Sequence, residues 1–350
     1  MRAFPFTIVP ALATIVASAC GGGHGSEVEP TTDPIPAVSA DAVYVVNGGD
    51  STISVIDAGS SSLLGTIQIN DAAFPHHIYM SADRSETFVA VPGIDLSEGH
   101  EGTGGEHHEM SWVLRLDAAT GAVLAVAMLD EMNHNAIPSP DGQTVWTSQM
   151  AEPGKVLFLD AASLEVTGEV AVEDMPAEVT FADDGSRAFV ANGGSDTVSV
   201  VDTSTRQVTA TIAVGDNPVG AWPGADGRLY VDNEAGQSIT AIDPVLTQAA
   251  QTYELGFTPA FVTTVGEELW VTDTDAGRVV FFDRASGEET GALSTGRGAH
   301  AIALSEDGSR AWITNQLDDT VSVVDTATRE VAATVAVGAK PNGISFRAAP

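Results

Sequence analysis

Basic side chains are scarce in this sequence. It has 14 lysines and arginines against 48 aspartates and glutamates, which gives a formal net charge of −34 at pH 7. Binding to nucleic acid or to an anionic membrane surface needs a basic face that attracts phosphate groups, so the composition argues against both partners. It is typical of a solubilised exported protein, and it also suits attraction of metal cations or of a basic partner.

Cysteine and long apolar runs are nearly absent too. Cys20 is the only cysteine, so no disulfide can form within a monomer. The apolar run from Phe6 to Val16 is too short to span a bilayer, but Arg2 before it and small residues after it are typical of a secretory signal. Small residues directly before a cysteine resemble a bacterial lipobox. The resemblance implies a signal peptide over residues 1–19 and lipidation of Cys20.

These features predict an exported lipoprotein that faces the periplasm or the cell surface, with plain secretion as the alternative. The membrane is then a partner only through the lipid anchor. Residues 20–41 are rich in glycine, proline and acids, so we expect a flexible linker there.

Long helical patterns are also absent, and a repeat takes their place. Residues 188–215 and 311–338 share 18 identities in register, and each copy reads as three short strands. An aromatic residue in the first strand and an aspartate that closes the second recur along the chain. The aromatics are Tyr44, Phe88, Trp146, Phe189, Tyr230, Trp270 and Trp312, and the aspartates are Asp57, Asp117, Asp160, Asp202, Asp243, Asp283 and Asp325.

The spacing of these landmarks predicts the fold. Successive aspartates are 60, 43, 42, 41, 40 and 42 residues apart, and four-stranded propeller blades repeat every ~40–45 residues. A fourth strand precedes each aromatic, except that the first copy lacks one and the last, 341–346, has nothing after it. We therefore predict an all-β, seven-bladed β-propeller over residues 42–350, monomeric, in which the two ends of the chain complete one blade and close the ring.

The strand Trp312-Ile313-Thr314-Asn315, followed by Thr-Val-Ser-Val-Val-Asp, resembles the YVTN seven-bladed propeller repeats of bacterial surface and periplasmic proteins. The resemblance covers residues 42 to 346. It implies the fold but not a function, because propellers carry many unrelated activities.

Histidines gather at one end of the predicted channel. His76, His134 and His300 share one position, the start of the innermost strand, in blades 2, 3 and 7, and Asn342 holds it in blade 1 between them. His77 follows His76. We expect these residues to form one arc around the channel mouth, with imidazole nitrogens less than about 10 Å apart if they share an ion.

One blade has an insertion on the same face. The spacing from aromatic to aspartate is 29 between Phe88 and Asp117, but 13 or 14 elsewhere. The extra residues contain four possible metal ligands, and three further methionines lie in loops on this face. The four are His100, His107, His108 and Met110, and the further methionines are Met132, Met150 and Met175.

Imidazole is the commonest protein ligand for metals, and thioethers favour copper, especially Cu(I). The leading hypothesis is an exported metal-binding protein, with copper first and zinc second. Its ligands would be His76, His77, His134 and His300, and the insertion would act as a lid with four more. The histidine pair and the channel histidines also resemble the copper-binding propeller of nitrous oxide reductase. The cupredoxin domain and Cys-rich motif are missing, so that activity is not implied.

Alternative interpretations remain open for these residues. A histidine at this position also caps the inner strand, a Gly-rich loop also stays solvated, and the seven aspartates are turn formers rather than a catalytic set. A metal-free scaffold could use the same face for a protein or a glycan. A metal-dependent enzyme, redox or lactonase-like with Glu178 and Asn342, is the third reading, but no catalytic motif supports it. We favour a binding protein over an enzyme.

Overall fold

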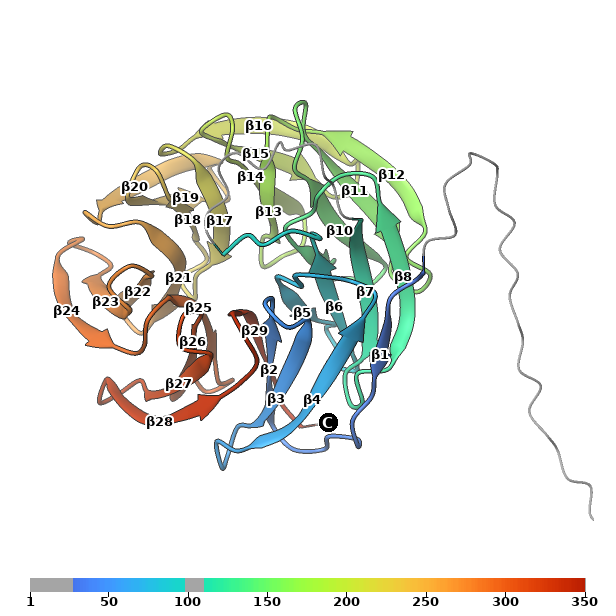
Figure 1. Ribbon diagram of the computed structural model, residues 1–350. Coiled ribbons are helices and arrows are strands. Elements are labelled where there is room, and N and C mark those ends of the chain that lie inside the picture. Colours follow the sequence, from blue (N-terminus) through green and yellow to red (C-terminus); the bar gives the residue numbers. More distant parts are fainter. Residues whose placement is uncertain (1–27, 98–109, 350) are drawn as a thin grey trace, which may run out of the picture.

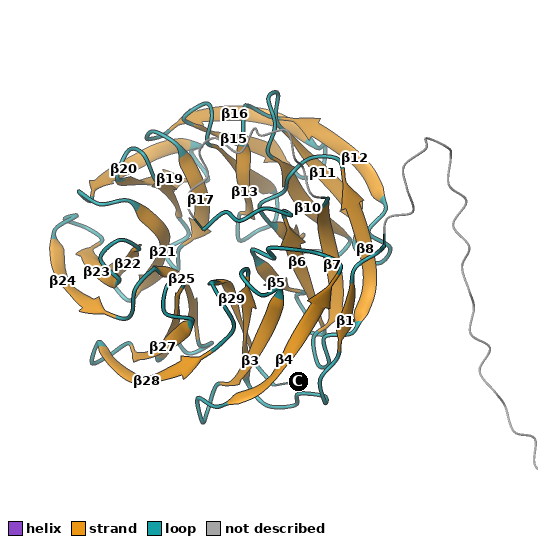
Figure 2. Ribbon diagram, in the orientation of Figure 1, coloured by secondary structure: helices purple, strands orange, loops and turns teal. Residues whose placement is uncertain are grey.

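The computed structural model describes residues 28–97 and 110–349, and it is a ring of seven β-sheets around a central channel (Figure 1). The predicted seven-bladed propeller is confirmed. Six sheets have four antiparallel strands, and every element of the described residues is a strand (Figure 2). None of these residues forms a helix that could cross a membrane.

Blade 1 joins the two ends of the chain. Its strands, from the outside inward, are β1 (Thr31–Asp33), β4 (Leu63–Asn70), β3 (Thr52–Asp57), β2 (Ala42–Asn47) and β29 (Pro341–Arg347). Pairing of β29 with β2 closes the ring as expected.

Blades 2 to 7 follow in chain order. Their innermost strands are β5 (Ile78–Met80), β9 (Ala136–Pro138), β13 (Pro176–Phe181), β17 (Pro218–Pro223), β21 (Pro259–Val265) and β25 (Ala299–Leu304). The second strands are β6 (Glu86–Val91), β10 (Thr144–Gln149), β14 (Arg187–Asn192), β18 (Leu229–Asn233), β22 (Glu268–Asp273) and β26 (Arg310–Asn315). The third are β7 (Ser111–Asp117), β11 (Lys155–Asp160), β15 (Thr197–Asp202), β19 (Ser238–Asp243), β23 (Arg278–Asp283) and β27 (Thr320–Asp325). The outer strands are β8 (Val123–Leu129), β12 (Val166–Ala171), β16 (Gln207–Ala213), β20 (Gln248–Glu254), β24 (Glu289–Ser294) and β28 (Glu330–Ala336).

Strand composition follows from this stacking of sheets. The middle strands are buried on both faces, so β27 reads Val-Ser-Val-Val between its ends, whereas the outer β28 is mostly exposed. The aspartate that closes each third strand accepts hydrogen bonds from the turn after it. At Asp202 the Ser204 hydroxyl and the Thr205 N–H are such donors, and they lower the pKa of its carboxyl to about 2. These aspartates are turn formers, as predicted.

The expected linker overlaps the propeller. Residues 31–33 form β1 on the edge of blade 1, and Val38 is buried. The N–H groups of Ile35 and Val38 donate to Thr120 O and Ala119 O, which lie in blade 2. Backbone pairing of β1 covers the edge of β4, so this part of the 20–41 segment is structured. Residues 1–27, with Cys20, lie outside the described residues.

Candidate metal centre

The inner strands turn their first residues into the channel through irregular pairing. The register shifts between Pro176 and Val179, and again between Ala299 and Ile302, so the residues between these positions leave the regular ladder. In blades 2 and 3 the inner strand is shortened to three residues, and His76 and His134 come just before it. Bulges of this kind re-aim side chains and are common beside functional sites.

Backbone hydrogen bonds position these short segments. The N–H of His76 donates to Ala90 O at 2.9 Å, and His77 O accepts from Ala90 N at 3.1 Å. The N–H of Gly343 in β29 donates to His76 O at 2.8 Å, which joins blade 1 to blade 2. The histidine backbone is therefore fixed from two blades.

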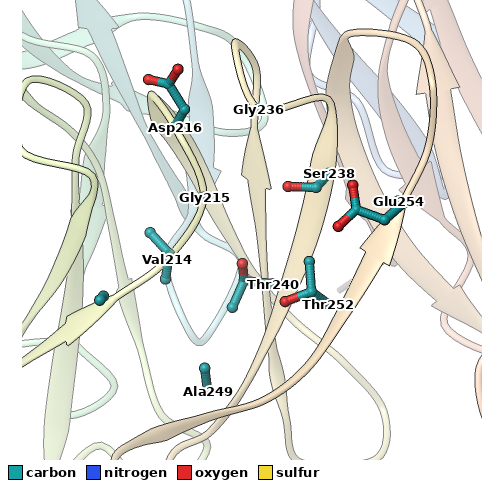
Figure 3. A pocket seen from close by; sticks show the side chains of 10 residues that line it. Val214, Gly215, Asp216, Gly236, Ser238, Thr240, Ala249, Thr252 and Glu254 are labelled. Carbon is teal, nitrogen blue, oxygen red and sulfur yellow. The ribbon is translucent and has the colours of Figure 1, made fainter.

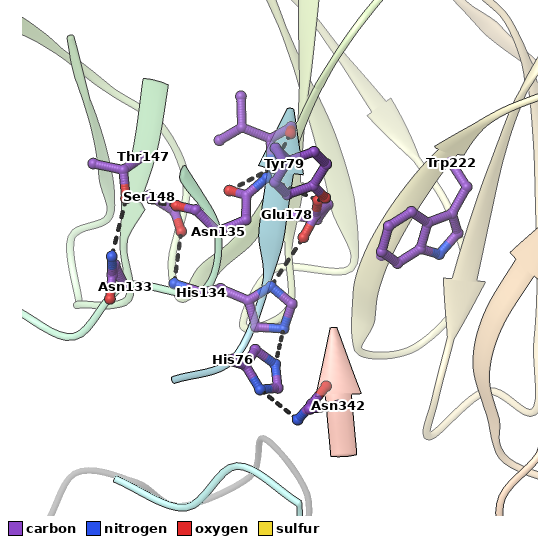
Figure 4. A network of polar contacts seen from close by, with 12 residues as sticks. His76, Tyr79, Asn133, His134, Asn135, Thr147, Ser148, Glu178, Trp222 and Asn342 are labelled. Carbon is purple, nitrogen blue, oxygen red and sulfur yellow. Dashed lines mark hydrogen bonds and ion pairs between the residues drawn. The ribbon is translucent and has the colours of Figure 1, made fainter. Parts of the chain in front are cut away.

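Three histidines converge in the channel. One nitrogen from each of His76, His77 and His134 lies within 4.8 Å of the others, and the three side chains are 2, 6 and 1% exposed. The Nε2 atoms of His76 and His134 are 3.2 Å apart (Figure 4). Two nitrogens bound at about 2.0–2.1 Å to one tetrahedral ion are separated by roughly 3.3–3.4 Å. The pair therefore already has the spacing of two ligands of one ion, whereas the His77 nitrogen, within 4.8 Å of the others, would have to move closer to share it.

The outer nitrogens of two rings face fixed partners. Nδ1 of His134 lies 3.0 Å from Glu178 Oε2 and can donate to it, which places the lone pair of the ring on Nε2. Nδ1 of His76 lies 2.6 Å from the Asn342 amide nitrogen, whereas Asn342 Oδ1 accepts no hydrogen bond within the described residues. Turning this amide by 180° makes Oδ1 the acceptor of a proton on Nδ1 of His76, which places the lone pair of that ring on Nε2.

Glu178 is itself held in place. The Tyr79 hydroxyl and the Asn135 amide both donate to its Oε1 atom, the amide at 2.8 Å. Burial raises the pKa of the Tyr79 phenol well above its ordinary value, and the Glu178 charge raises it further, so Tyr79 stays a proton donor. A carboxylate that orients a histidine in this manner is a common support of metal ligands.

An aromatic wall closes the other side of the trio. The Trp222 ring lies 6.0 Å from the His77 ring and 4.1 Å from Phe261. Trp222 Nε1 donates to the buried Asp232 at 2.6 Å. Burial raises the pKa of Asp232 to about 7, and the Glu234 charge adds to this, against the Trp222 and Gly220 donors.

The other predicted ligands do not join this group. The His300 ring centroid is 6.4 Å from that of His76, and His300 is not among the converging nitrogens of the described residues. Met110 packs against the core between blades 1 and 2. Met132 and Met150 belong to an apolar cluster with Leu96, Ala177 and Val219, and Met175 packs on it. His100, His107 and His108 lie outside the described residues.

Asn135 was not predicted, and Glu178 was named only for a lactonase-like site, although a signal for both existed. The position after the shared histidine position holds His77, Asn135 and Glu178 in blades 2 to 4. In blades 5, 6, 7 and 1 it holds Gly220, Phe261, Ala301 and Gly343. Polar residues confined to adjacent blades mark the site. Tyr79 and Trp222 carry no such mark.

A separate polar cleft lies between blades 4 and 5 (Figure 3). Its volume is about 380 Å³, and hydroxyl groups and the carboxylates of Asp216 and Glu254 line it. It contains no histidine, and the histidine trio is the one group of possible metal ligands found among the described residues.

Comparison with known proteins supports the propeller fold and shows no family. No protein-family model and no curated protein matches the chain, so the YVTN resemblance stays an expectation. Among solved structures, the periplasmic gluconolactonase PpgL of Pseudomonas aeruginosa is 19% identical with a TM-score of 0.71, over 89% of this chain and 99% of that one. Dihydro-heme d1 dehydrogenase NirN is 16% identical with a TM-score of 0.63, over 89% and 76%. Apo AztD of Citrobacter koseri is 12% identical with a TM-score of 0.58, over 89% and 98%. At these identities the likeness concerns the propeller fold alone.

Proposed function

We propose that this protein is an exported propeller that binds one transition-metal ion, copper or zinc, through His76, His77 and His134. The 3.2 Å approach of two buried Nε2 atoms carries the proposal. Two lone pairs at this distance repel unless a proton or a cation lies between them. Three protein ligands also leave a fourth position open for a water or a second molecule.

The surroundings support a cation at this point. The buried Glu178 carboxylate stands behind His134 and offsets part of an ion's charge. The net charge of −34 attracts cations to the protein from a distance. Export rests on the N-terminal pattern, and it agrees with the periplasmic location stated for one structural neighbour.

The choice between copper and zinc depends on the ligand types. Imidazole suits both ions, whereas the argument for Cu(I) came from thioethers. Because Met110, Met132 and Met150 have packing roles, the described ligands favour a divalent ion, Cu²⁺ or Zn²⁺. A metal-free scaffold remains the competing class of function.

Metal content of the full-length protein tests the proposal. The protein is purified without a histidine tag from cells supplied with copper and zinc, and its metals are measured by mass spectrometry. We expect about one equivalent of one ion, absent from a His76→Ala, His134→Ala double variant that unfolds at the same temperature as the metal-free parent. The matched variant His300→Ala should keep its metal. Less than a tenth of an equivalent, with no uptake on titration with either ion, would overturn the proposal and leave the scaffold.

A further inference from the structure

Residues 92–97 lie over the channel on the face where the inner strands begin, above the buried histidine trio. The segment Pro92–Ser97, which follows β6 in blade 2, runs across the ring toward β17 (Figure 1). Its residue Leu96 is 4% exposed and packs on Met132, Ala177 and Val219. Ala177 and Val219 belong to blades 4 and 5, across the channel from blade 2. The segment therefore bridges the mouth.

The contacts of Leu96 are neighbours of the site residues. Met132 stands two positions before His134, and Ala177 directly precedes Glu178. An apolar side chain thus rests on the backbone segments that carry a ligand and its supporting carboxylate. Leu96 therefore lies on the side from which an ion would approach these segments.

An ion pair holds the middle of the segment. The Lys340 ammonium group contacts Asp95 Oδ2 and donates to Ser97 Oγ at 3.2 Å. The Ser97 N–H donates to Asp95 Oδ1 at 3.0 Å, which keeps the aspartate turned toward the lysine. Lys340 comes just before β29, so the pair connects the segment to blade 1.

The lysine is not needed by the turn in which it stands. Lys340 has a φ of 52°, and the equivalent residues before the inner strands of other blades, Phe74, Met175 and Asn217, have φ values of 55°, 50° and 51°. Asparagine is among the side chains that tolerate this conformation best, and a long cation is not. The Lys340 N–H donates to Asp319 and its carbonyl accepts from Gly48, so the backbone is held independently of the ammonium group.

We propose that Pro92–Ser97 is a gate over the metal site, and that the Lys340–Asp95 ion pair is the latch that sets how fast an ion enters and leaves. The inference rests on the proposed function. Because the gate covers the site without supplying a ligand, opening it changes the rates of loading and release by the same factor. The dissociation constant stays constant.

Two single substitutions separate a latch from a general charge effect. Lys340→Asn keeps the turn, as Asn217 shows, and makes the protein more negative; Asp95→Asn makes it less negative. Loading of Zn²⁺ or Cu²⁺ and removal by excess EDTA are followed by stopped flow. Both variants should accelerate both rates about two- to fivefold, as expected for loss of a partly exposed ion pair. A charge effect would move their loading rates in opposite directions and would overturn the latch.

Three further variants sharpen the test. Leu96→Ala removes the apolar contact and should accelerate exchange by about tenfold or more, because a buried leucine contributes more than such an ion pair. The exchanged pair Lys340→Asp with Asp95→Lys should restore slow exchange. Arg297→Gln breaks the exposed ion pair with Asp318 in an equivalent loop and should leave the rates unchanged.

A readout without metal distinguishes failure of the gate from failure of the proposed function. Diethyl pyrocarbonate modifies accessible imidazoles, and peptide mass spectrometry reports His76, His77 and His134 in the metal-free protein. Faster labelling in Lys340→Asn and Asp95→Asn supports the gate even if no metal binds. Unchanged labelling together with unchanged exchange rates overturns the gate while metal binding stands.

Discussion

Both ring nitrogens of His134 face a fixed neighbour. Its Nδ1 atom faces Glu178 at 3.0 Å, and its Nε2 atom faces His76 at 3.2 Å. The carboxylate selects the tautomer with the proton on Nδ1 and makes the ring a better electron donor. Glu178 keeps its position because Tyr79 and Asn135 satisfy its other oxygen.

Replacing Glu178 by glutamine tests this orientation. Glutamine has the same shape, but it carries no charge and offers one acceptor, so the tautomer of His134 is no longer enforced. Metal affinity should fall by about 10- to 100-fold, measured by competition with a chelator of known affinity. Asp174→Asn, an acid in the loop before the same strand, is the control. Equal affinities for Glu178→Gln and the parent would contradict the assigned role.

Asp232 should make stability depend on pH. Its pKa is about 7 in the folded state against 3.8 ordinarily, because burial disfavours the charged form. The folded protein therefore holds this proton more tightly than the unfolded chain. The stabilisation that Asp232 gives the folded state is fully present below pH 3.8 and is lost as pH rises through 7. The free energy of unfolding then falls by up to about 1.4 kcal/mol per pH unit.

Asp232→Asn removes this titration and keeps an acceptor for Trp222. We compare the free energy of unfolding of the two proteins in urea between pH 5 and pH 8. The parent should lose stability relative to the variant over this range. A constant difference between the two proteins would show that Asp232 does not titrate there.

At the scale of elements, the site depends on how closely β29 approaches the segment before β5. A Cβ atom on Gly343 would lie 2.5 Å from His76 O and 2.7 Å from the Cα of His77. Both are backbone atoms that cannot turn away. Glycine at this position is what allows blade 1 to place Asn342 beside His76.

Gly343→Ala should therefore damage both the fold and the site. Pushing β29 away from blade 2 should cost about 1–3 kcal/mol in the free energy of unfolding. Metal affinity should fall with it, because Asn342 and His76 separate. Gly168→Ala in β12 is the control, since its added atom meets only ordinary contacts at 3.6 Å. Equal effects of the two substitutions in a denaturation series would contradict the argument.

For the whole molecule, ring closure decides whether the blades hold together. β29 pairs with β2, and Phe346 stacks on Trp312 of blade 7 with ring centroids 5.6 Å apart. The strand therefore joins blade 7 to blade 1 as well as completing a sheet. Without it, β2 would present an unpaired edge to the channel.

A chain ending at residue 340 should lose several kcal/mol, a large part of the ~5–15 kcal/mol typical of folded proteins. A chain ending at Arg347 keeps the whole strand and should unfold like the parent. The unfolding temperatures of both chains are measured by circular dichroism during heating. A cooperative transition at an unchanged temperature in the shorter chain would show that the ring does not need its closing strand.

The ring, its seven blades and its closure could all be predicted from the pattern of residues along the chain. Blade stacking buries both faces of the middle strands and requires the same turn after each one, so the period of Asp57 to Asp325 is visible without coordinates. It also placed His76, His134, His300 and Asn342 at one level of the channel.

Which of these side chains meet could be seen only in the folded protein. The bulges and shortened strands aim side chains in ways that a repeat does not encode, so His77 enters the trio while His300 stays outside it. Contacts between blades also revealed Tyr79 and Lys340, and they placed Glu178, named from the sequence only for a lactonase-like site, beside His134. The period of the repeat shows where a residue lies along its blade. A binding site, however, depends on where side chains of different blades point and how far apart they lie.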